Sequence, residues 1–353
     1  MIFQNSIVRF IAFFIPVKDM REGFIKSFSR KTKYRKLRED NERLFAETAQ
    51  IKKEVSLLKK HVDIRFAGFI NAFYSLEDIK YKNPDLELLQ QINLILLKKF
   101  KMLCKEHNIK YWLDSGTLLG AVRHGGFIPW DDDVDIGMTR DDFNKLEEAI
   151  SKDSELILNY HYVVKSYGQK IGRVFLKDLL RKQDFVFLDI YIFDFLDIDD
   201  KKEFQSFFNK TREQFNQEVR EFRATHKLDL DHNNFMKLHP KEAKNSDLER
   251  LFTKFVSNFK IKNKGNYLKN LTHVCDINLI HSASSVFPLA TINFEGEEYT
   301  MPNNPDEYLR NQYKNYMAIR ADIGHPHHEL LLSSYEIMEI MRNYIKEHTQ
   351  SEH

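Results

Sequence analysis

The segment that decides the fold is Tyr111–Met138, which reads YWLDSGTLLGAVRHGGFIPWDDDVDIGM. Near its start, the small residues Ser115, Gly116 and Thr117 form a predicted turn that leads into a helix over Leu118–Arg123. Exposed backbone N–H groups at such a helix start bind anions and suit a phosphate group. We therefore expect Ser115, Gly116 and Thr117 to bind phosphate.

The same segment closes on a run of aspartates. Asp133 and Asp135 alternate with apolar residues, as in a strand, so we expect both carboxylates on one face. Close carboxylates repel unless a divalent cation neutralises them, and an all-oxygen set favours magnesium or manganese over zinc. Acidic runs are usually solvated loops, but apolar residues flank this one, and unpaired carboxylates are costly to bury. Asp131 and Asp132 are second candidates, as outer ligands or, for Asp131, as a turn or cap residue.

The surrounding sequence predicts the elements that support this segment. Apolar residues at helical spacing predict a helix from Asp85 to about His107. Alternation over Phe185–Leu196 predicts a strand that contains Asp189. The charged segment Lys201–Asn263 is expected to be rich in helix and to pack over the sheet.

The motifs resemble a known family. Gly116–Thr117 followed by Asp133–Val134–Asp135–Ile136 resembles the nucleotidyltransferase-superfamily pattern, in which many members have serine where this chain has Thr117. The fuller text SGTLLGAVRHGGFIPWDDDVDIGM is similar to the LicD/fukutin family of phosphotransferases, over approximately residues 86–328. The resemblance implies an α/β (α+β) fold with a mixed sheet flanked by helices. It also implies a third acidic residue on a neighbouring strand, supplied by Asp189 within FLDIYIFD.

The resemblance implies transfer of a phospho-alcohol group, such as phosphocholine, from a CDP-activated donor. The acceptor would be a hydroxyl of a cell-surface glycan or glycolipid: a lipopolysaccharide, teichoic acid or capsule precursor. On this interpretation Asp133 and Asp135 hold magnesium, and Asp189 accepts the acceptor's proton while touching the metal. The alcohol (choline, ethanolamine, ribitol or glycerol) and the acceptor sugar stay open.

Basic residues near the motif have two interpretations. Arg123, just after the predicted helix, is expected to bind a donor phosphate, with a surface ion pair as the alternative. For Lys170 and Arg173, phosphate contacts are conceivable, but we expect solvated positions. His325–His328 lacks the partners of a tetrahedral zinc site and is interpreted as a loop.

The carboxy-terminal part carries a weaker signature of the family. It consists of Tyr308–Leu309, Tyr313 and Tyr316–Met317. Lys314–Asn315 stands where the family usually has Gly–Asp. We expect the catalytic domain to span residues 85–345.

The amino-terminal residues lie outside the resemblance. Residues 1–32 combine a short apolar face with a strongly basic stretch, which suits an anionic membrane surface or, alternatively, packing on the protein itself. Residues 33–66 predict a coiled coil and a homodimer, with a lone amphipathic helix as the alternative. The seam consists of Leu37, Leu44, Ile51 and Leu58, with Asn41, Thr48, Val55 and Val62 at the other position.

Composition narrows the function classes. A net charge of +2 gives no support to nucleic-acid binding, and two cysteines, Cys104 and Cys275, cannot form a disulfide framework. There is no apolar run of about 20 residues, the length that a membrane-spanning helix needs. We expect a cytoplasmic protein at the inner face of the cell membrane. A glycosyltransferase with an Asp-x-Asp metal site and a membrane-associated scaffold are the alternatives.

Overall fold

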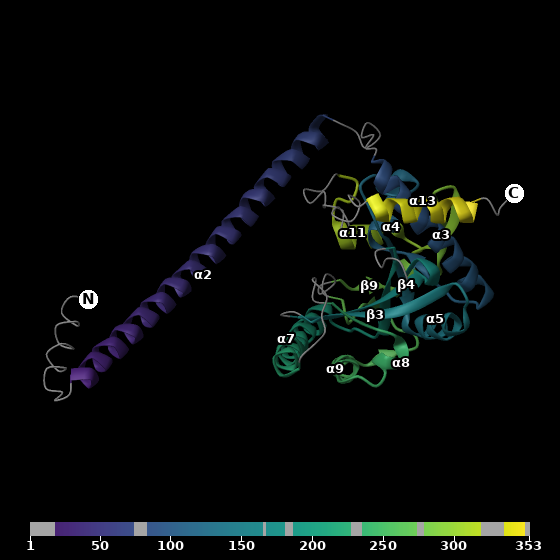
Figure 1. Ribbon diagram of the computed structural model, residues 1–353. Coiled ribbons are helices and arrows are strands. Elements are labelled where there is room, and N and C mark those ends of the chain that lie inside the picture. The colour runs from purple at the N-terminus through teal and green to yellow at the C-terminus, as the bar shows by residue number, and fades with distance from the viewer. Residues whose placement is uncertain are drawn as a thin grey trace. The chain divides into compact units, whose positions relative to one another are not determined.

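The computed structural model describes residues 18–73, 83–164, 167–180, 186–226, 235–273, 279–318 and 335–349 (Figure 1). The chain divides into two compact units at the junction of Phe73 and Tyr74. Two sequence-based expectations lie outside the described residues: the apolar face within residues 1–17 and the loop at His325–His328.

The described residues of the amino-terminal unit form one long helix, α2 (Lys18–Phe73), of 56 residues (Figure 1). The predicted helix over residues 33–66 is therefore confirmed, and α2 continues through the expected boundary at residues 32 and 33. Its predicted partner helix stays a prediction. Among the described residues, no helix is both long enough and apolar enough to span a membrane.

The second unit is built on a mixed sheet, as predicted. Its main path runs β1-β2-β5-β4-β3-β6, in which β2 and β5 are parallel and the other neighbours antiparallel. The bounds are β1 Trp112–Leu113, β2 Val134–Thr139, β3 Leu156–Val164, β4 Gly168–Leu176, β5 Leu188–Leu196 and β6 Phe235–Leu238. The second half of β5 pairs with β7 (Ile261–Lys262) and β8 (Tyr267–Lys269), and β9 (His281–Ser282) pairs with β8. A separate hairpin joins β10 (Ala290–Phe294) to β11 (Glu297–Met301).

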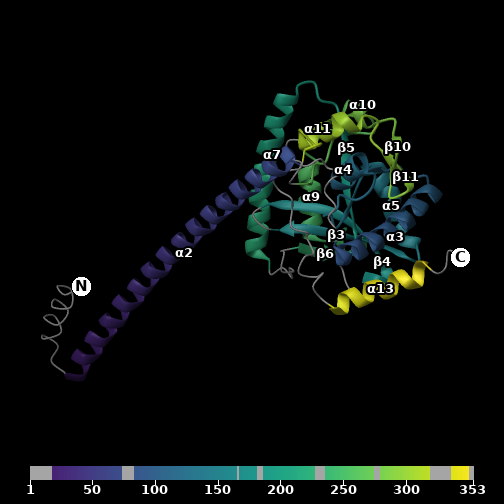
Figure 2. The same ribbon diagram turned by 90° about the horizontal axis from the view of Figure 1, so that it is seen from above.

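Helices surround this sheet. They are α3 Pro84–Glu106, α4 Ser115–His124, α5 Arg140–Lys152, α6 Lys177–Leu180, α7 Lys201–Thr225, α8 Pro240–Ala243, α9 Asp247–Val256, α10 Ala283–Val286, α11 Pro305–Tyr313 and α13 Tyr335–Thr349. Figures 1 and 2 both place α7 at one edge of this unit, and α13 packs on α3. The expected helix-rich segment after Lys201 is confirmed as α7, α8 and α9.

Helix α3 shows how local sequence sets these elements. The Asn83 side chain accepts hydrogen bonds from the N–H groups of Asp85 and Leu86, and Pro84 stands at the first helical position. Both features fix a helix start. The apolar residues at helical spacing are buried: Leu86, Leu89, Ile92, Leu96, Phe100 and Leu103. The predicted helix is thus confirmed, beginning at Pro84.

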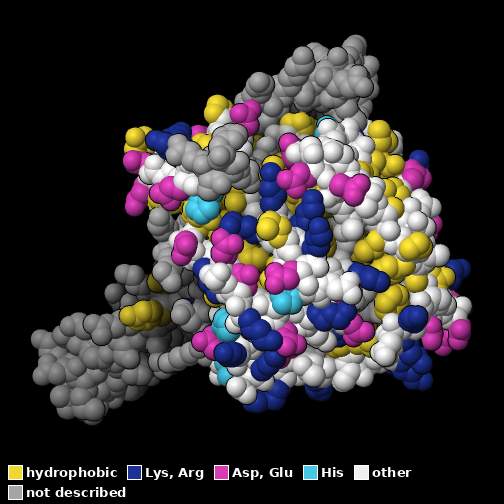
Figure 3. Space-filling view, turned by 90° about the vertical axis from the view of Figure 1, so that its right-hand side faces the viewer, with side chains coloured by type: hydrophobic (Ala, Val, Ile, Leu, Met, Phe, Trp, Pro, Cys, Tyr) yellow, Lys and Arg dark blue, Asp and Glu magenta, His cyan; other side chains and the backbone are white. Residues whose placement is uncertain are grey.

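One face of the molecule is electrostatically mixed. On the face shown in Figure 3, basic and acidic side chains lie side by side, in keeping with a net charge of +2.

His161 on β3 makes the fold sensitive to acid. Burial and the Arg173 guanidinium lower the pKa of His161 to about 2, so the folded protein holds it neutral while the unfolded chain takes up a proton below about pH 6.5. Stability should therefore fall as the pH falls from 6.5 towards 4, by about 1.4 kcal/mol per pH unit from this residue. Urea unfolding across this window should show a shallower pH slope for His161→Gln. The exposed His107→Gln is the control, and an unchanged slope in H161Q would contradict the prediction.

Candidate active site

Helix α4 begins at the predicted phosphate-binding turn. Asp114 caps it, since its Oδ1 accepts the N–H of Ser115 at 2.7 Å. The helix starts at Ser115 and not at Leu118, so the sequence-based start is wrong by one turn: the Asp114 cap lets the small residues join the helix. The Gly116 N–H donates to Asp135 Oδ2 at 3.1 Å. The helix start thus binds a carboxylate of the protein in this structure.

Gly116 leaves room for this close approach. A Cβ atom at this position would lie 2.9 Å from Asp131 Oδ2 and 3.5 Å from Asp135 Oδ2. A contact of 2.9 Å forces the carboxylate to move. Glycine therefore leaves the space in which the carboxylates meet the helix.

Thr117 connects α4 to β2. Its Oγ1 accepts the backbone N–H of Asp135 at 2.8 Å, and the residue is buried. The backbone N–H of Asp114 in turn donates to the carbonyl of Asp135 at 3.0 Å. These two bonds fix the backbone N–H and the backbone carbonyl of Asp135.

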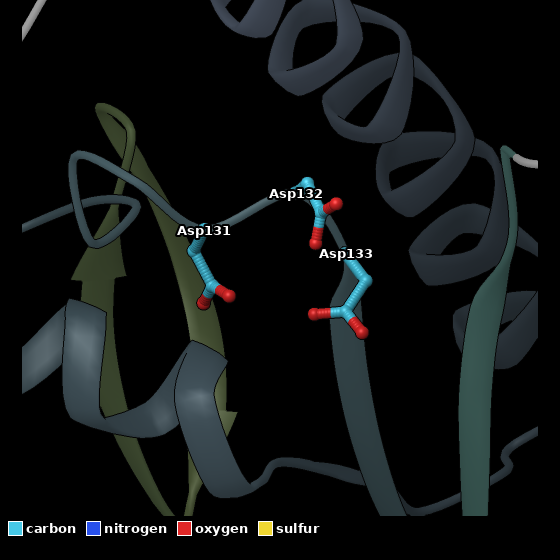
Figure 4. Close-up of side chains that lie close together, drawn as sticks. All are labelled: Asp131, Asp132 and Asp133. Atoms are coloured by element: carbon cyan, nitrogen blue, oxygen red, sulfur yellow. The ribbon is translucent and has the colours of Figure 1, made fainter. Parts of the chain in front are cut away.

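Two neighbouring strands place three carboxylates together. Asp135 on β2 pairs in register with Asp189 on β5, and Asp133 directly precedes β2. One oxygen of each of Asp133, Asp135 and Asp189 lies within 4.8 Å of the others. The same holds for Asp131, Asp132 and Asp133 (Figure 4). We call these five residues the acidic cluster.

The acidic cluster suits a hard divalent cation. Its donors are carboxylate oxygens, the ligands that Mg²⁺, Mn²⁺ and Ca²⁺ prefer. Asp135 and Asp189 are 7% and 5% exposed, so their charges are largely removed from water. Burial, followed by the charges of Asp133, Asp189 and Asp131, raises the pKa of Asp135 well above its usual value. A bound cation would offset both the cost of burying these charges and the repulsion between them, as in a metal site.

Asp189 also forms an ion pair with Arg173 on β4. The Arg173 Nε lies 2.6 Å from Asp189 Oδ1, and Nη2 lies 3.3 Å from Oδ2. The guanidinium also stacks on the Phe187 ring, 3.8 Å from its centroid. Two hydrogen bonds and a stacked face fix both the position and the plane of the Asp189 carboxylate.

The expectation that Lys170 and Arg173 are solvated is wrong. The Arg173 side chain is 16% exposed and paired with Asp189. The Lys170 side chain is 11% exposed, bonds Glu249 at 2.7 Å and lies over the Tyr160 ring. Strand alternation places Arg173 on the face of Asp189, but pairing of β4 with β5 could not be read from a single sequence.

Arg123 lies in the last turn of α4, at the end opposite Gly116. Its Nη1 donates to the carbonyl of Tyr316 at 3.0 Å, and its Nε donates to His124 Nε2. The structure thus places Arg123 against the segment that follows α11. Its expected contact with a donor phosphate stays a prediction.

The carboxy-terminal signature residues support the helix cap. Tyr308 on α11 is buried, and its O–H donates to Asp114 Oδ1 at 2.9 Å. Gln312 Nε2 donates to the same oxygen at 3.1 Å. The supporting roles of Asp114 and Gln312 were not among the predictions from the sequence. The sequence offered one signal for this contact, Tyr308 in the carboxy-terminal signature, but it did not indicate which residue Tyr308 contacts.

Lys314, where the resemblance implies a glycine, has a backbone conformation that glycine adopts more readily. It ends α11 with φ 60° and ψ −105°, a conformation that side chains with a Cβ rarely adopt. Lys314→Gly should therefore raise the free energy of unfolding by about 1 kcal/mol, measured by urea unfolding. Lys314→Ala, which keeps the Cβ, is the control and should give no such gain. Equal stability of K314G and K314A would contradict the strain argument.

Comparison with known proteins assigns the sheet and the acidic cluster to a family. Residues 108–239 match the family model for LicD/FKTN/FKRP, nucleotidyltransferase domain. This stretch is a LicD-family domain. The LicD domain contains the acidic cluster, α4 and the main sheet path through β6, and is shorter than the expected 86–328.

Curated relatives match within parts of the chain. The lipopolysaccharide cholinephosphotransferase LicD of Haemophilus influenzae is 33% identical over 113 residues, which cover 30% of this chain and 43% of the relative. The ribitol 5-phosphate transferase FKRP of Homo sapiens is 52% identical over 40 residues, 11% of this chain and 8% of the relative. An uncharacterized protein of Rickettsia prowazekii, RP689, is 49% identical over 61 residues, which cover 17% of this chain and 23% of the relative. The matches thus span less than half of each of these relatives.

Proposed function

We propose that the LicD domain transfers a phospho-alcohol group, phosphocholine or a similar group, from a CDP-activated donor to a hydroxyl of a cell-surface glycan. The observation that carries the proposal is the acidic cluster, at and before the start of β2 and on β5, inside the LicD domain. The names of the relatives, a cholinephosphotransferase of lipopolysaccharide and a ribitol 5-phosphate transferase, agree on the class of group transferred.

Each residue of the site has a proposed role. Asp133, Asp135 and Asp189 would hold the divalent cation, Mg²⁺ on the chemistry of the donor set. When bound, the cation neutralises charge on the phosphate oxygens of an in-line displacement. Asp189 would accept the proton of the acceptor hydroxyl. Arg173 positions Asp189, since it fixes that carboxylate without belonging to the cluster.

The experiment that tests this function is thermal unfolding of the full chain with Mg²⁺ and candidate donors. We would compare CDP-choline, CDP-ethanolamine, CMP, UDP-glucose and UDP-GlcNAc, with EDTA replacing Mg²⁺ in parallel samples. A ligand at a hundredfold excess over its dissociation constant stabilises the fold by about 2.7 kcal/mol. We expect magnesium-dependent protection by CMP and a CDP-alcohol, and its loss in Asp133→Asn. Protection by UDP-sugars alone would replace the proposal with a glycosyltransferase, and protection by none would favour a scaffold.

We further propose that residues 1–32 hold the protein on the inner, cytoplasmic face of the cell membrane. The basic excess of this segment supports the proposal. Sedimentation with vesicles tests it: the full chain should bind vesicles rich in anionic lipid and should not bind neutral phosphatidylcholine vesicles.

A further inference from the structure

Helix α2 presents an apolar stripe with seven-residue spacing. We number the heptad so that Leu37, Leu44, Ile51 and Leu58 occupy position d, and Asn41, Thr48, Val55 and Val62 occupy position a. The large apolar side chains are each more than half exposed: Leu37 57%, Leu44 54%, Ile51 59%, Val55 58%, Leu58 64% and Val62 64%. Each recurs near the same side of the helix, so a second helix would bury them all along one seam.

The charges beside this stripe select one kind of partner. In this numbering the g positions carry Asp40, Glu47, Glu54 and His61, and the e positions carry Arg38, Phe45, Lys52 and Lys59. Acidic residues thus occupy three of the four positions along one edge of the stripe, and basic residues three of the four along the other. A partner with complementary edges is a second copy of the same helix, provided that its direction brings unlike edges together.

The direction follows from this pattern. In a parallel, in-register pair, each g residue faces the e residue of the next heptad on the other helix. Glu47 then faces Lys52 of the second copy, and Glu54 faces Lys59 of the second copy. An antiparallel pair would set g against g and e against e, which places like charges together. The parallel arrangement is therefore favoured.

The seam residues agree with a two-stranded assembly. Val55 and Val62 are β-branched residues at position a, and leucine fills most d positions, a combination that favours dimers. Asn41 at position a penalises other registers. Within one helix, Glu47 pairs with Arg43 at 3.5 Å, and both side chains are exposed. Exposed pairs of this kind contribute little, about 0.3–0.5 kcal/mol, and can be exchanged for contacts between helices.

We propose that α2 binds a second copy of this chain as a parallel, in-register, two-stranded coiled coil. The interface would run from Leu37 to Val62, with four d and four a positions, flanked by the Glu47–Lys52 and Glu54–Lys59 pairs between copies. This interface does not depend on the proposed transferase activity.

The test measures mass and direction in the full chain. Sedimentation equilibrium over a range of concentrations should give twice the chain mass of 42.1 kDa. Leu44→Glu with Ile51→Glu should give the monomer while the unfolding transition of the second unit is kept. Glu47→Lys with Glu54→Lys should raise the dimer dissociation constant by about tenfold or more, and mixing with the Lys52→Glu, Lys59→Glu variant should restore the dimer.

Direction is tested by oxidation of Leu37→Cys. A parallel in-register dimer brings the two copies of position 37 together, so a covalent dimer should form. Glu39→Cys, on the outer side of the helix, is the matched control and should cross-link far less. A monomeric wild type, a dimer that survives L44E/I51E, a higher oligomer, or a dimer in which L37C fails to cross-link would each overturn the proposal.

Discussion

If the proposed function holds, Asp135→Asn should lower phosphotransfer by about 10³-fold or more, because it would remove a proposed cation ligand at the centre of the acidic cluster. The same substitution should stabilise the metal-free protein at neutral pH. Asp135 is buried beside Asp133 and Asp189, which raises its pKa, so ionised Asp135 costs folding free energy. An asparagine carbonyl can still accept the Gly116 N–H, so the local geometry is kept.

The pH dependence of this effect has a definite sign. A group whose pKa is raised by folding stabilises the fold fully below its unfolded pKa, about 3.9 for aspartate, and this contribution is lost as the pH rises through the folded pKa. In EDTA, the wild type should therefore lose stability relative to D135N with rising pH. With Mg²⁺ the order should reverse, since only the wild type binds the cation. Near-normal turnover of D135N would refute the assignment of Asp135.

Arg140→Met should destabilise the domain by about 3–5 kcal/mol, because it leaves Asp194 buried and unpaired. Arg140 at the start of α5 holds Asp194 on β5 through Nε–Oδ1 at 2.5 Å and Nη2–Oδ2 at 2.7 Å. The Asp194 side chain is fully buried, and burial raises its pKa even beside the guanidinium. Urea unfolding of the full chain measures the loss.

A double variant distinguishes loss of the whole Arg140–Asp194 ion pair from loss of one partner. Arg140→Met with Asp194→Leu removes both charges and should recover most of the stability lost in R140M, since an apolar pair can replace a buried ion pair. Arg310→Met is the matched control: Arg310 also pairs with an aspartate, Asp306, but both side chains are more than half exposed. R310M should change stability by less than about 1 kcal/mol. If R140M lost no more stability than R310M, the prediction would be contradicted, because the buried Asp194 charge would then not depend on Arg140.

The centre of the site could be predicted from the sequence because strand alternation is a short-range property. Asp133 and Asp135 share a face for this reason, and the motif resemblance singled out Asp189 on a separate predicted strand. Their register, Asp135 beside Asp189, confirms that expectation. Asp194 belongs to the same run of sequence, but alternation puts it on the opposite face from Asp189, where it pairs with Arg140.

The supporting residues could not be predicted, because their contacts cross long stretches of chain. Asp114 is joined to Tyr308, 194 residues away, and Lys170 to Glu249, 79 residues away. A lysine or arginine on a predicted strand is most simply read as solvated, and only the strand order shows that Arg173 meets Asp189. The predicted start of α4 is wrong for a related reason: Asp114 follows the strand-like residues Trp112 and Leu113, yet it serves as the helix cap.

The position of the two tryptophans gives the protein a built-in optical probe of the site. The chain has 2 tryptophans, and both lie beside the acidic cluster or its supports. Trp130 directly precedes Asp131 and meets the His124 ring edge-on. Trp112 is buried and donates its indole N–H to the Tyr308 hydroxyl, which in turn bonds Asp114. Intrinsic emission at the red edge of absorption, where tyrosine is silent, therefore comes entirely from this neighbourhood, so binding of the proposed cation can be tested without a label.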